Sequence, residues 1–319
     1  MSGRLSLLLA LAALLCLALS LLAGPSHVLP WQAKTDPFAA IVIMDLRLPR
    51  GLLALLVGGA LGLAGAAMQG YLRNPLADPG LFGISSSAAL GAVVAIGFGA
   101  SGWPLPLMSF AGAAGGMALL ALIAGRTDSL LVFTLAGVML SSLTGALTAL
   151  VISLAPNPFA TSEIMNWLIG ALTDRSWPEV ALVAGPVLVG ATLLVATRGA
   201  LDALTLGEAA ARSLGVDFGR LRLLMLLGVG LVTGAAVATT GVIGFVGLVV
   251  PHLLRPLVGG RPSALLLPSA LGGGLLLLVA DSIVRLLPLA AELRLGVVMA
   301  LIGAPFFLAL LMAMRRRIA

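Results

Sequence analysis

The chain has 319 residues, of which 60% are hydrophobic and only 9% are charged, and its mean hydropathy is +1.16. An ordinary soluble domain carries about 25% charged residues, so this composition excludes a soluble globular protein, and the apolar excess also excludes a disordered one. The net charge of +6 would suit a nucleic-acid partner only if the basic residues formed a patch, but they stand singly between apolar runs. We therefore expect a membrane protein that binds lipid and no nucleic acid.

Ten apolar runs follow one another along the chain. A membrane-spanning helix takes about 20 residues, so ten spans leave no room for a separate soluble domain. We predict one transmembrane domain over 1–319, and a retained first helix, because its apolar run is longer than that of a signal peptide. The predicted spans are 5–23, 47–70, 81–99, 105–124, 130–154, 179–197, 221–239, 241–258, 263–284 and 295–314.

The orientation follows from the basic residues in the connections. An even number of spans places both termini on one side, and 12 of the 18 Lys and Arg residues fall on that side. Because basic residues are retained in the cytoplasm, we expect both termini to be cytoplasmic. The predicted fold class is an all-α polytopic membrane protein with about ten transmembrane helices.

Small residues recur at spacings that allow helices to pack closely. Glycine accounts for 40 of the 319 residues, with Gly58 four residues before Gly62 and Gly112 four before Gly116. Such spacings let helix backbones approach one another in lipid. We therefore expect a compact helix bundle.

A weak internal repeat relates the two halves of the chain. The stretch from Arg47 through spaced leucines to Gly65-Ala-Ala is similar to the stretch from Arg220 to Gly234-Ala-Ala. The first stretch opens span two from outside and the second opens span seven from inside. This pattern predicts an inverted repeat of spans 2–5 and 7–10, as in many transporters, and a chance match in a Leu-, Ala- and Gly-rich chain is the alternative.

The sequence contains no nucleotide-binding loop. A Walker loop needs a Gly-rich turn before a Lys, but the only lysine, Lys34, lies in Gln-Ala-Lys-Thr. Any ATP must therefore be hydrolysed by a separate subunit, and this chain is not expected to be an enzyme. We also expect no metal site, because His27 and His252 have no further ligand at a suitable spacing and Cys16 is a single cysteine in an apolar run.

Three polar features are candidates for function. Asp281 and Arg285 are spaced as an ion pair on one helix face, either at a helix end or with a gating or docking role at the outer mouth. The segment 74–80 contains two prolines and a glycine, so it breaks the helix and forms either a pathway constriction or a plain turn. The cytoplasmic stretch 206–215 predicts a short surface helix with Glu208 and Arg212 paired, either a partner-docking helix or a solvated linker.

Short motifs spread along the chain carry a family resemblance. They are Arg47-Leu-Pro-Arg50, Met68-Gln69, Asn74-Pro-Leu-Ala-Asp-Pro79, Gly80 to Gly83, Leu135-Ala-Gly-Val138, Leu206-Gly-Glu208, Ser213-Leu-Gly215, Gly244-Phe-Val-Gly-Leu248, Pro251-His-Leu-Leu-Arg255, Ala280-Asp281, Gly296 and Gly303-Ala-Pro305-Phe-Phe307. With these motifs the chain resembles, over nearly its whole length, the permease subunits of type II ATP-binding-cassette importers for iron-siderophores, haem and cobalamin. It departs from that pattern at Leu130 to Val132 and at Arg294, where the family commonly has a polar stretch and a proline.

The resemblance implies an assembly in the bacterial inner membrane. It implies a homodimer with two cytoplasmic ATPase subunits, which bind the ATP and Mg, and a periplasmic or lipid-anchored substrate-binding protein. The permease itself would bind no cofactor, and the pathway would run along the dimer interface.

The resemblance also implies roles for individual residues. Arg47, Arg50 and Arg285 would dock the binding protein, because family arginines at these places meet acidic residues. Asn74 and Leu76 would lie in the cytoplasmic gate. The ATPase coupling helix would include Leu206, Gly207, Glu208, Ala209, Leu214 and Gly215.

The expected function is passage of a bulky metal chelate, such as a ferric siderophore, haem or cobalamin, into the cytoplasm. An ion-coupled secondary carrier is the alternative that the inverted repeat favours. The small number of acidic residues within the spans argues against it, because most of the 12 fall in connections or at span ends. A channel or structural membrane protein is a third class.

Overall fold

The computed structural model describes residues 2–24, 26, 28–124, 130–288 and 291–318, and over these residues the chain is helical without strands. Seven stretches are long and apolar enough to cross a membrane, and one of them, Pro37–Tyr71, includes two short helical pieces before its main helix. The long helices are α1 (Ser2–Ser20), α3 (Leu48–Tyr71), α5 (Pro104–Ala124), α6 (Leu130–Ser153), α8 (Trp177–Ala196), α11 (Phe218–Thr240) and α13 (Pro262–Leu286).

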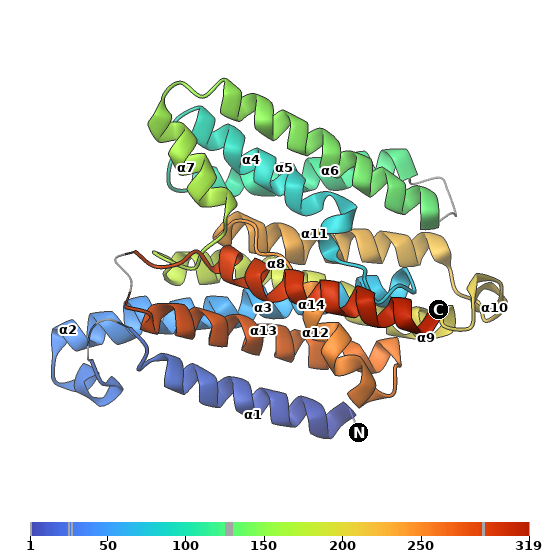
Figure 1. The fold of residues 1–319 in the computed structure, drawn as a ribbon, viewed down its shortest axis with the longest axis horizontal. Coiled ribbons are helices and arrows are strands. Elements are labelled where there is room, and N and C mark those ends of the chain that lie inside the picture. The colour runs from blue at the N-terminus through green and yellow to red at the C-terminus, as the bar shows by residue number, and fades with distance from the viewer. Residues whose placement is uncertain (1, 25, 27, 125–129, 289–290, 319) are drawn as a thin grey trace.

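Three further apolar helices bring the described crossings to the predicted ten. They are α4 (Ile84–Gly97), α12 (Val246–Leu254), which the turn η4 (Arg255–Val258) extends, and α14 (Leu295–Ile318). The chain's two ends lie at the same end of the bundle, as an even number of crossings requires (Figure 1). We call this the inner end, and we call the opposite end, where α2 and α7 lie, the outer end.

Short helices occupy the connections. At the outer end these are η1 (Pro30–Lys34), α2 (Pro37–Ala40), the π-helical turn η2 (Ile41–Arg47) and α7 (Pro158–Leu168), and at the inner end η3 (Pro79–Phe82), α9 (Arg198–Leu204) and α10 (Glu208–Ser213). Of these, α7 lies in a stretch predicted as a connection. Its start carries a local signal, because the Asn157 side chain accepts a hydrogen bond from the Ala160 N–H at 2.9 Å and Pro158 takes the first helical position.

The centre of the bundle is formed by α3, α11 and α13. We compare the apolar 18-residue segment of each stretch. Of its residues, 78% are buried in Pro37–Tyr71 and 72% in α11, but only 11% in α1. The exposed surfaces of α1, α5, α6 and α8 are apolar, as a lipid or subunit interface requires. Burial therefore distinguishes the inner helices from the exposed α1, α5, α6 and α8.

The central helices pair across the two halves of the chain. A side chain on Gly58 would overlap the Gly273 carbonyl oxygen and one on Gly62 that of Ser269, so α3 lies against the backbone of α13. In the other half, α11 lies against α5, and a Cβ on Gly234 would stand 2.9 Å from the Ala113 side chain. The first helix of each half thus packs on the third helix of the other half. This crossed pairing is what an inverted repeat of spans 2–5 and 7–10 predicts.

Both halves also contain a break after their first helix. The backbone leaves the helix after Tyr71 and resumes at η3, where the Asp78 carboxylate accepts a hydrogen bond from the Gly80 N–H at 2.8 Å. In the second half, the residues from Gly241 to Phe245 separate α11 from α12, and Phe245 has a positive φ of 67°. The prediction of broken backbone at 74–80 is confirmed.

Candidate functional site

Arg47 is buried and holds the first outer loop by hydrogen bonds. Its guanidinium donates hydrogen bonds to the carbonyl oxygens of Leu21 at 2.7 Å, Ser26 at 2.6 Å and Val28 at 3.1 Å. Only 5% of the residue is exposed. Since these acceptors lie between the end of α1 and the start of α2, Arg47 holds the connection between the two helices.

Arg50 and Arg285 share one buried carboxylate. Arg50 donates to both Asp281 carboxylate oxygens from Nε at 3.0 and 3.1 Å, and its Nη2 lies 2.8 Å from Glu292 Oε2. Arg285 Nε stands 3.0 Å from Asp281 Oδ2 as an ion pair without a well-directed hydrogen bond, while its Nη1 donates to the Ala23 carbonyl oxygen at 3.2 Å. The network therefore joins α3, α13, the first outer loop and the connection before α14.

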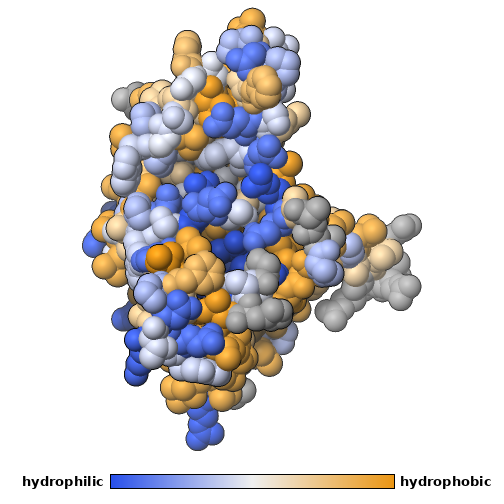
Figure 2. Space-filling view, turned by 90° about the vertical axis from the view of Figure 1, so that its left-hand side faces the viewer, coloured by the Kyte–Doolittle hydropathy of each residue, from blue (hydrophilic) through white to orange (hydrophobic). Residues whose placement is uncertain are grey.

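Burial makes this network an internal one. Asp281 is 1% exposed and Arg285 6%, and the Arg50 side chain is 11% exposed. The predicted pair of Asp281 and Arg285 is confirmed. The bidentate grip expected of an arginine in this family is present at Arg50, but the carboxylate belongs to this chain. The docking role of Arg47, Arg50 and Arg285 stays a prediction, although hydrophilic residues do gather in the middle of this outer face (Figure 2).

Glu292 and Thr173 belong to this network but were not predicted. The Thr173 hydroxyl donates to Glu292 Oε2 at 3.1 Å, next to the Arg50 contact. Burial alone would raise the pKa of Glu292, but the hydrogen bonds from Arg50 and Thr173 and the charges of Arg50 and Arg285 lower it overall. Glu292 stands 242 residues from Arg50 in the chain, so no local spacing could have revealed the contact.

At the inner end, Asn74 and Leu76 form a tight turn. The Asn74 side-chain oxygen accepts a hydrogen bond from the Leu76 N–H at 3.0 Å, and its carbonyl accepts from Ala77 N–H at 3.1 Å. Asn74 is exposed and Leu76 is half-buried. The predicted gate residues therefore lie together in the break between α3 and η3, where a turn is the observed geometry and gating stays a prediction.

Gln69 anchors this turn to the second half of the chain. Its side-chain NH2 donates to the carbonyl oxygens of Gly247 and Leu248, both at 3.3 Å, and its oxygen accepts from Arg255 Nη2 at 2.6 Å. Gln69 is fully buried in α3, while its partners lie on α12 and η4. The Met68-Gln69 motif thus holds the end of α3 against α12.

The predicted surface helix at 206–215 is confirmed as α10. Gly207 before it and Gly215 after it have φ values of 99° and 84°, a region in which residues with a Cβ are strained. Leu206 is 67% exposed and Leu214 65%, and Ala209 is exposed between them. This apolar edge at the inner end has the character of a surface that a partner covers.

The mounting of α10 connects it to two other inner elements. Glu208 lies 3.6 Å from Arg73, the residue before the Asn74 turn. On α9, the Asp202 carboxylate accepts from the Ser263 N–H at 2.9 Å and from the Ser263 hydroxyl at 2.6 Å, at the start of α13. Glu208 of α10 thus lies near the predicted gate turn, while the neighbouring α9 is bonded to the central helix α13. The Arg212 guanidinium packs over the Phe218 ring at 4.6 Å.

His252 lies in an aromatic contact. His252 packs edge-on against the Phe306 ring with a centroid separation of 5.8 Å, and His27 lies outside the described residues. Within the described part of the chain, no three His, Cys, Asp or Glu side chains are grouped as metal ligands.

Comparison with known proteins gives consistent matches. The model of the FecCD transport family matches residues 7–313. The chain is 40% identical to the Fe(3+) dicitrate transport system permease protein FecD of Escherichia coli, over 94% of this chain and 95% of FecD. It is also 40% identical to the vitamin B12 import system permease protein BtuC of Salmonella typhi, over 97% of this chain and 94% of BtuC.

A solved structure extends the match to three dimensions. An inward-facing conformation of a metal-chelate type ABC transporter superposes with a TM-score of 0.90 at 35% identity, covering 98% of this chain and 99% of the other. The family model, the sequence identity and the superposition cover nearly all of the helices described above. The chain belongs to the FecCD transport family, whose members are multi-pass membrane permeases.

Proposed function

We propose that this chain is the permease subunit of an ATP-binding-cassette importer that moves a bulky metal chelate into the cytoplasm. The observation that carries the proposal is the inner surface of α10, where exposed leucines flank a short helix that packs on α9 and lies beside Arg73. A chain with no Walker lysine needs an external source of ATP energy, and this surface suits a partner ATPase.

The proposed assembly is a homodimer with two ATPase subunits and an outer substrate-binding protein. In it, Leu206, Ala209 and Leu214 contact the ATPase, while Glu208 transmits its movement through Arg73 to Asn74 and Leu76. At the outer end the binding protein docks over the network of Arg47, Arg50 and Arg285. Since these arginines are already paired, docking would act through the loops that they hold as well as through charge.

The proposed cargo is a ferric siderophore, haem or cobalamin. The relatives transport iron dicitrate or vitamin B12 according to their names, and the solved neighbour is of the metal-chelate type. These cargoes share a large size and a tightly held metal. The chain provides passage and performs no chemistry on them.

Uptake of the three labelled chelates tests the proposal. It is measured in cells with and without the gene, and then in proteoliposomes that contain the whole complex, with and without vanadate. We expect deletion to abolish uptake of one chelate and vanadate to block uptake in proteoliposomes. Vanadate-resistant transport driven by an ion gradient would instead establish a secondary carrier, and normal uptake of all three chelates in the deletion strain would refute the proposed cargo class.

A further inference from the structure

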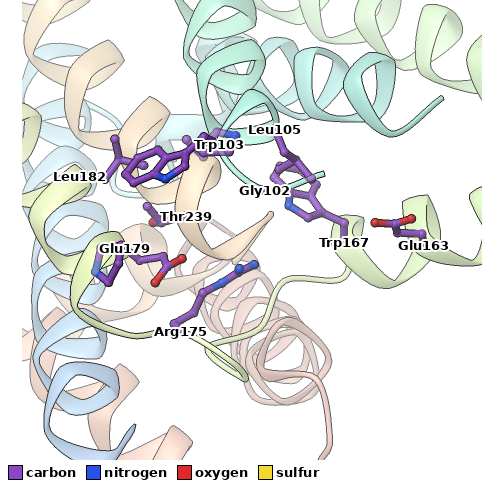
Figure 3. A pocket seen from close by; sticks show the side chains of 12 residues that line it. Gly102, Trp103, Leu105, Glu163, Trp167, Arg175, Glu179, Leu182 and Thr239 are labelled. Atoms are coloured by element: carbon purple, nitrogen blue, oxygen red, sulfur yellow. The ribbon is translucent and has the colours of Figure 1, made fainter. Parts of the chain in front are cut away.

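A cavity of about 420 Å³ lies at the outer end between α5, α7, α8 and α11 (Figure 3). Two indole rings, Trp103 and Trp167, line it together with the charged side chains of Glu163, Arg175 and Glu179. None of the predicted docking, gate or coupling residues lines it. The cavity is therefore separate from the predicted sites, and the proposed transport function does not explain what binds in it.

Two donors in this cavity have no partner among the described residues. The indole Nε1 of Trp167 and the Nε of Arg175 are buried, and neither has a hydrogen-bond acceptor in the described structure. Burial lowers the pKa of the Arg175 guanidinium, because the cation loses water there. Buried donors without acceptors are uncommon, and these two would be satisfied by an anionic oxygen such as that of a phosphate group.

The opposite charge is also present. Glu179 is occupied, since its Oε2 accepts hydrogen bonds from the Ser176 N–H at 2.8 Å and hydroxyl at 3.3 Å. Glu163 on α7 is the other acid of the cavity wall, and it is exposed. Indole rings also attract ammonium groups through their faces. The wall thus suits a zwitterion that carries a phosphate and an ammonium group.

The depth of the cavity is that of lipid headgroups. The chain has four tryptophans, and all of them lie in outer connections or in the first or last turn of an outer helix: Trp31, Trp103, Trp167 and Trp177. Tryptophan is enriched where lipid headgroups meet the hydrocarbon. The cavity therefore lies at the outer boundary of the membrane.

We propose that the cavity binds the headgroup of an outer-leaflet phospholipid with a primary ammonium group, such as phosphatidylethanolamine. Arg175 and the Trp167 indole donate hydrogen bonds to the phosphate. Glu163 accepts from the ammonium group beside the Trp167 ring (Figure 3). The proposal goes beyond the transport function and does not depend on the identity of the cargo.

Native mass spectrometry of the purified complex tests this site. Phosphatidylethanolamine and phosphatidylglycerol with identical acyl chains are added separately, and retained lipid is counted. We expect the ethanolamine lipid to be retained at least about fivefold better, and Arg175→Gln to lower its retention about tenfold. Glu163→Gln should remove the preference between the two lipids. Lys34→Gln and Trp31→Phe, two changes on exposed outer side chains, should leave retention unchanged.

Several outcomes would overturn the proposal. Equal retention of the two lipids by the unmodified complex, or an equal loss in Lys34→Gln and Arg175→Gln, would contradict a specific headgroup site. Competition by glycerophosphoethanolamine at the same concentration as the lipid would show that the ligand is a soluble zwitterion. If Arg175→Gln fails to fold, Trp167→Phe gives the second measurement, and unchanged retention in that variant contradicts the assigned phosphate contact.

Discussion

The two ends of the molecule treat their polar motifs in opposite ways. At the outer end, Arg47, Arg50 and Arg285 are buried and bonded within the chain, whereas at the inner end α10 presents Leu206 and Leu214 to the surroundings. The outer motif thus stabilises the fold before any partner arrives. The inner motif contributes little to the chain's own packing, so its form is explained by a partner. The difference teaches that a motif shared by a family indicates a partner-binding surface only where its side chains are not already bonded within the chain.

The largest effect should come from removing the shared carboxylate at the outer end. Asp281→Asn leaves the buried charge of Arg285 without its counter-ion and leaves Arg50 with only the partly exposed Glu292, which costs about 3–5 kcal/mol. We expect low yield and a strongly reduced Tm of the purified permease, measured by thermal unfolding in detergent. Asp36→Asn, a change to an exposed outer carboxylate, is the control. Wild-type thermal stability in Asp281→Asn would show that the network is unnecessary for folding.

The next effect concerns the packing of the two central helices. In Gly62→Ala the new Cβ overlaps the Ser269 carbonyl oxygen, so α3 and α13 must separate, at a cost of about 1–3 kcal/mol. The matched control is Gly185→Ala on α8, where a Cβ meets no atom within 4 Å. Thermal unfolding should distinguish the two variants, and equal Tm values would contradict the close approach.

A smaller effect, confined to association, is expected at the inner end. Leu206→Ala with Leu214→Ala should weaken binding of the ATPase subunit about tenfold, equivalent to about 1.4 kcal/mol, with an unchanged Tm of the isolated permease. Leu223→Ala, also apolar and 54% exposed, but on the membrane-spanning helix α11, is the control. Binding is measured by co-purification over a range of ATPase concentrations. If Leu223→Ala weakened ATPase binding as much as the double variant does, α10 would not be the ATPase-binding surface.

The smallest effect is a pH dependence at Glu292. Its pKa is lowered in the folded chain, so its ion pair with Arg50 adds stability above the unfolded pKa, and that stability disappears as pH falls through the folded pKa. In Glu292→Gln, the loss of stability that comes from protonation of this carboxylate should be absent. We expect a difference of about 1–2 °C in the acid-induced fall of Tm between wild type and variant, because the pair is partly exposed. Identical falls would contradict the lowered pKa.

Local patterns in the sequence explain why much of the architecture was predictable. The ten apolar runs correspond to ten helices, and Asp281 with Arg285 or Gly207 with Gly215 depend only on nearby spacing. Contacts between distant segments were beyond such reasoning. Arg50 meets Asp281 across 231 residues, and Gln69 meets Gly247 across 178. The docking role of the arginines stays a prediction, and their internal partners could not be predicted, since these depend on the tertiary fold.

The crossed pairing of the halves has a consequence for synthesis of the protein. The glycine face of α3 fits the backbone of α13, which lies about 200 residues further along the chain. During translation, α3 enters the membrane long before this partner is made. Its glycine face therefore stays without this partner until α13 has been inserted. The bundle therefore closes late, when the C-terminal third has been inserted, and a chain truncated before Pro262 should remain an incomplete, protease-sensitive assembly.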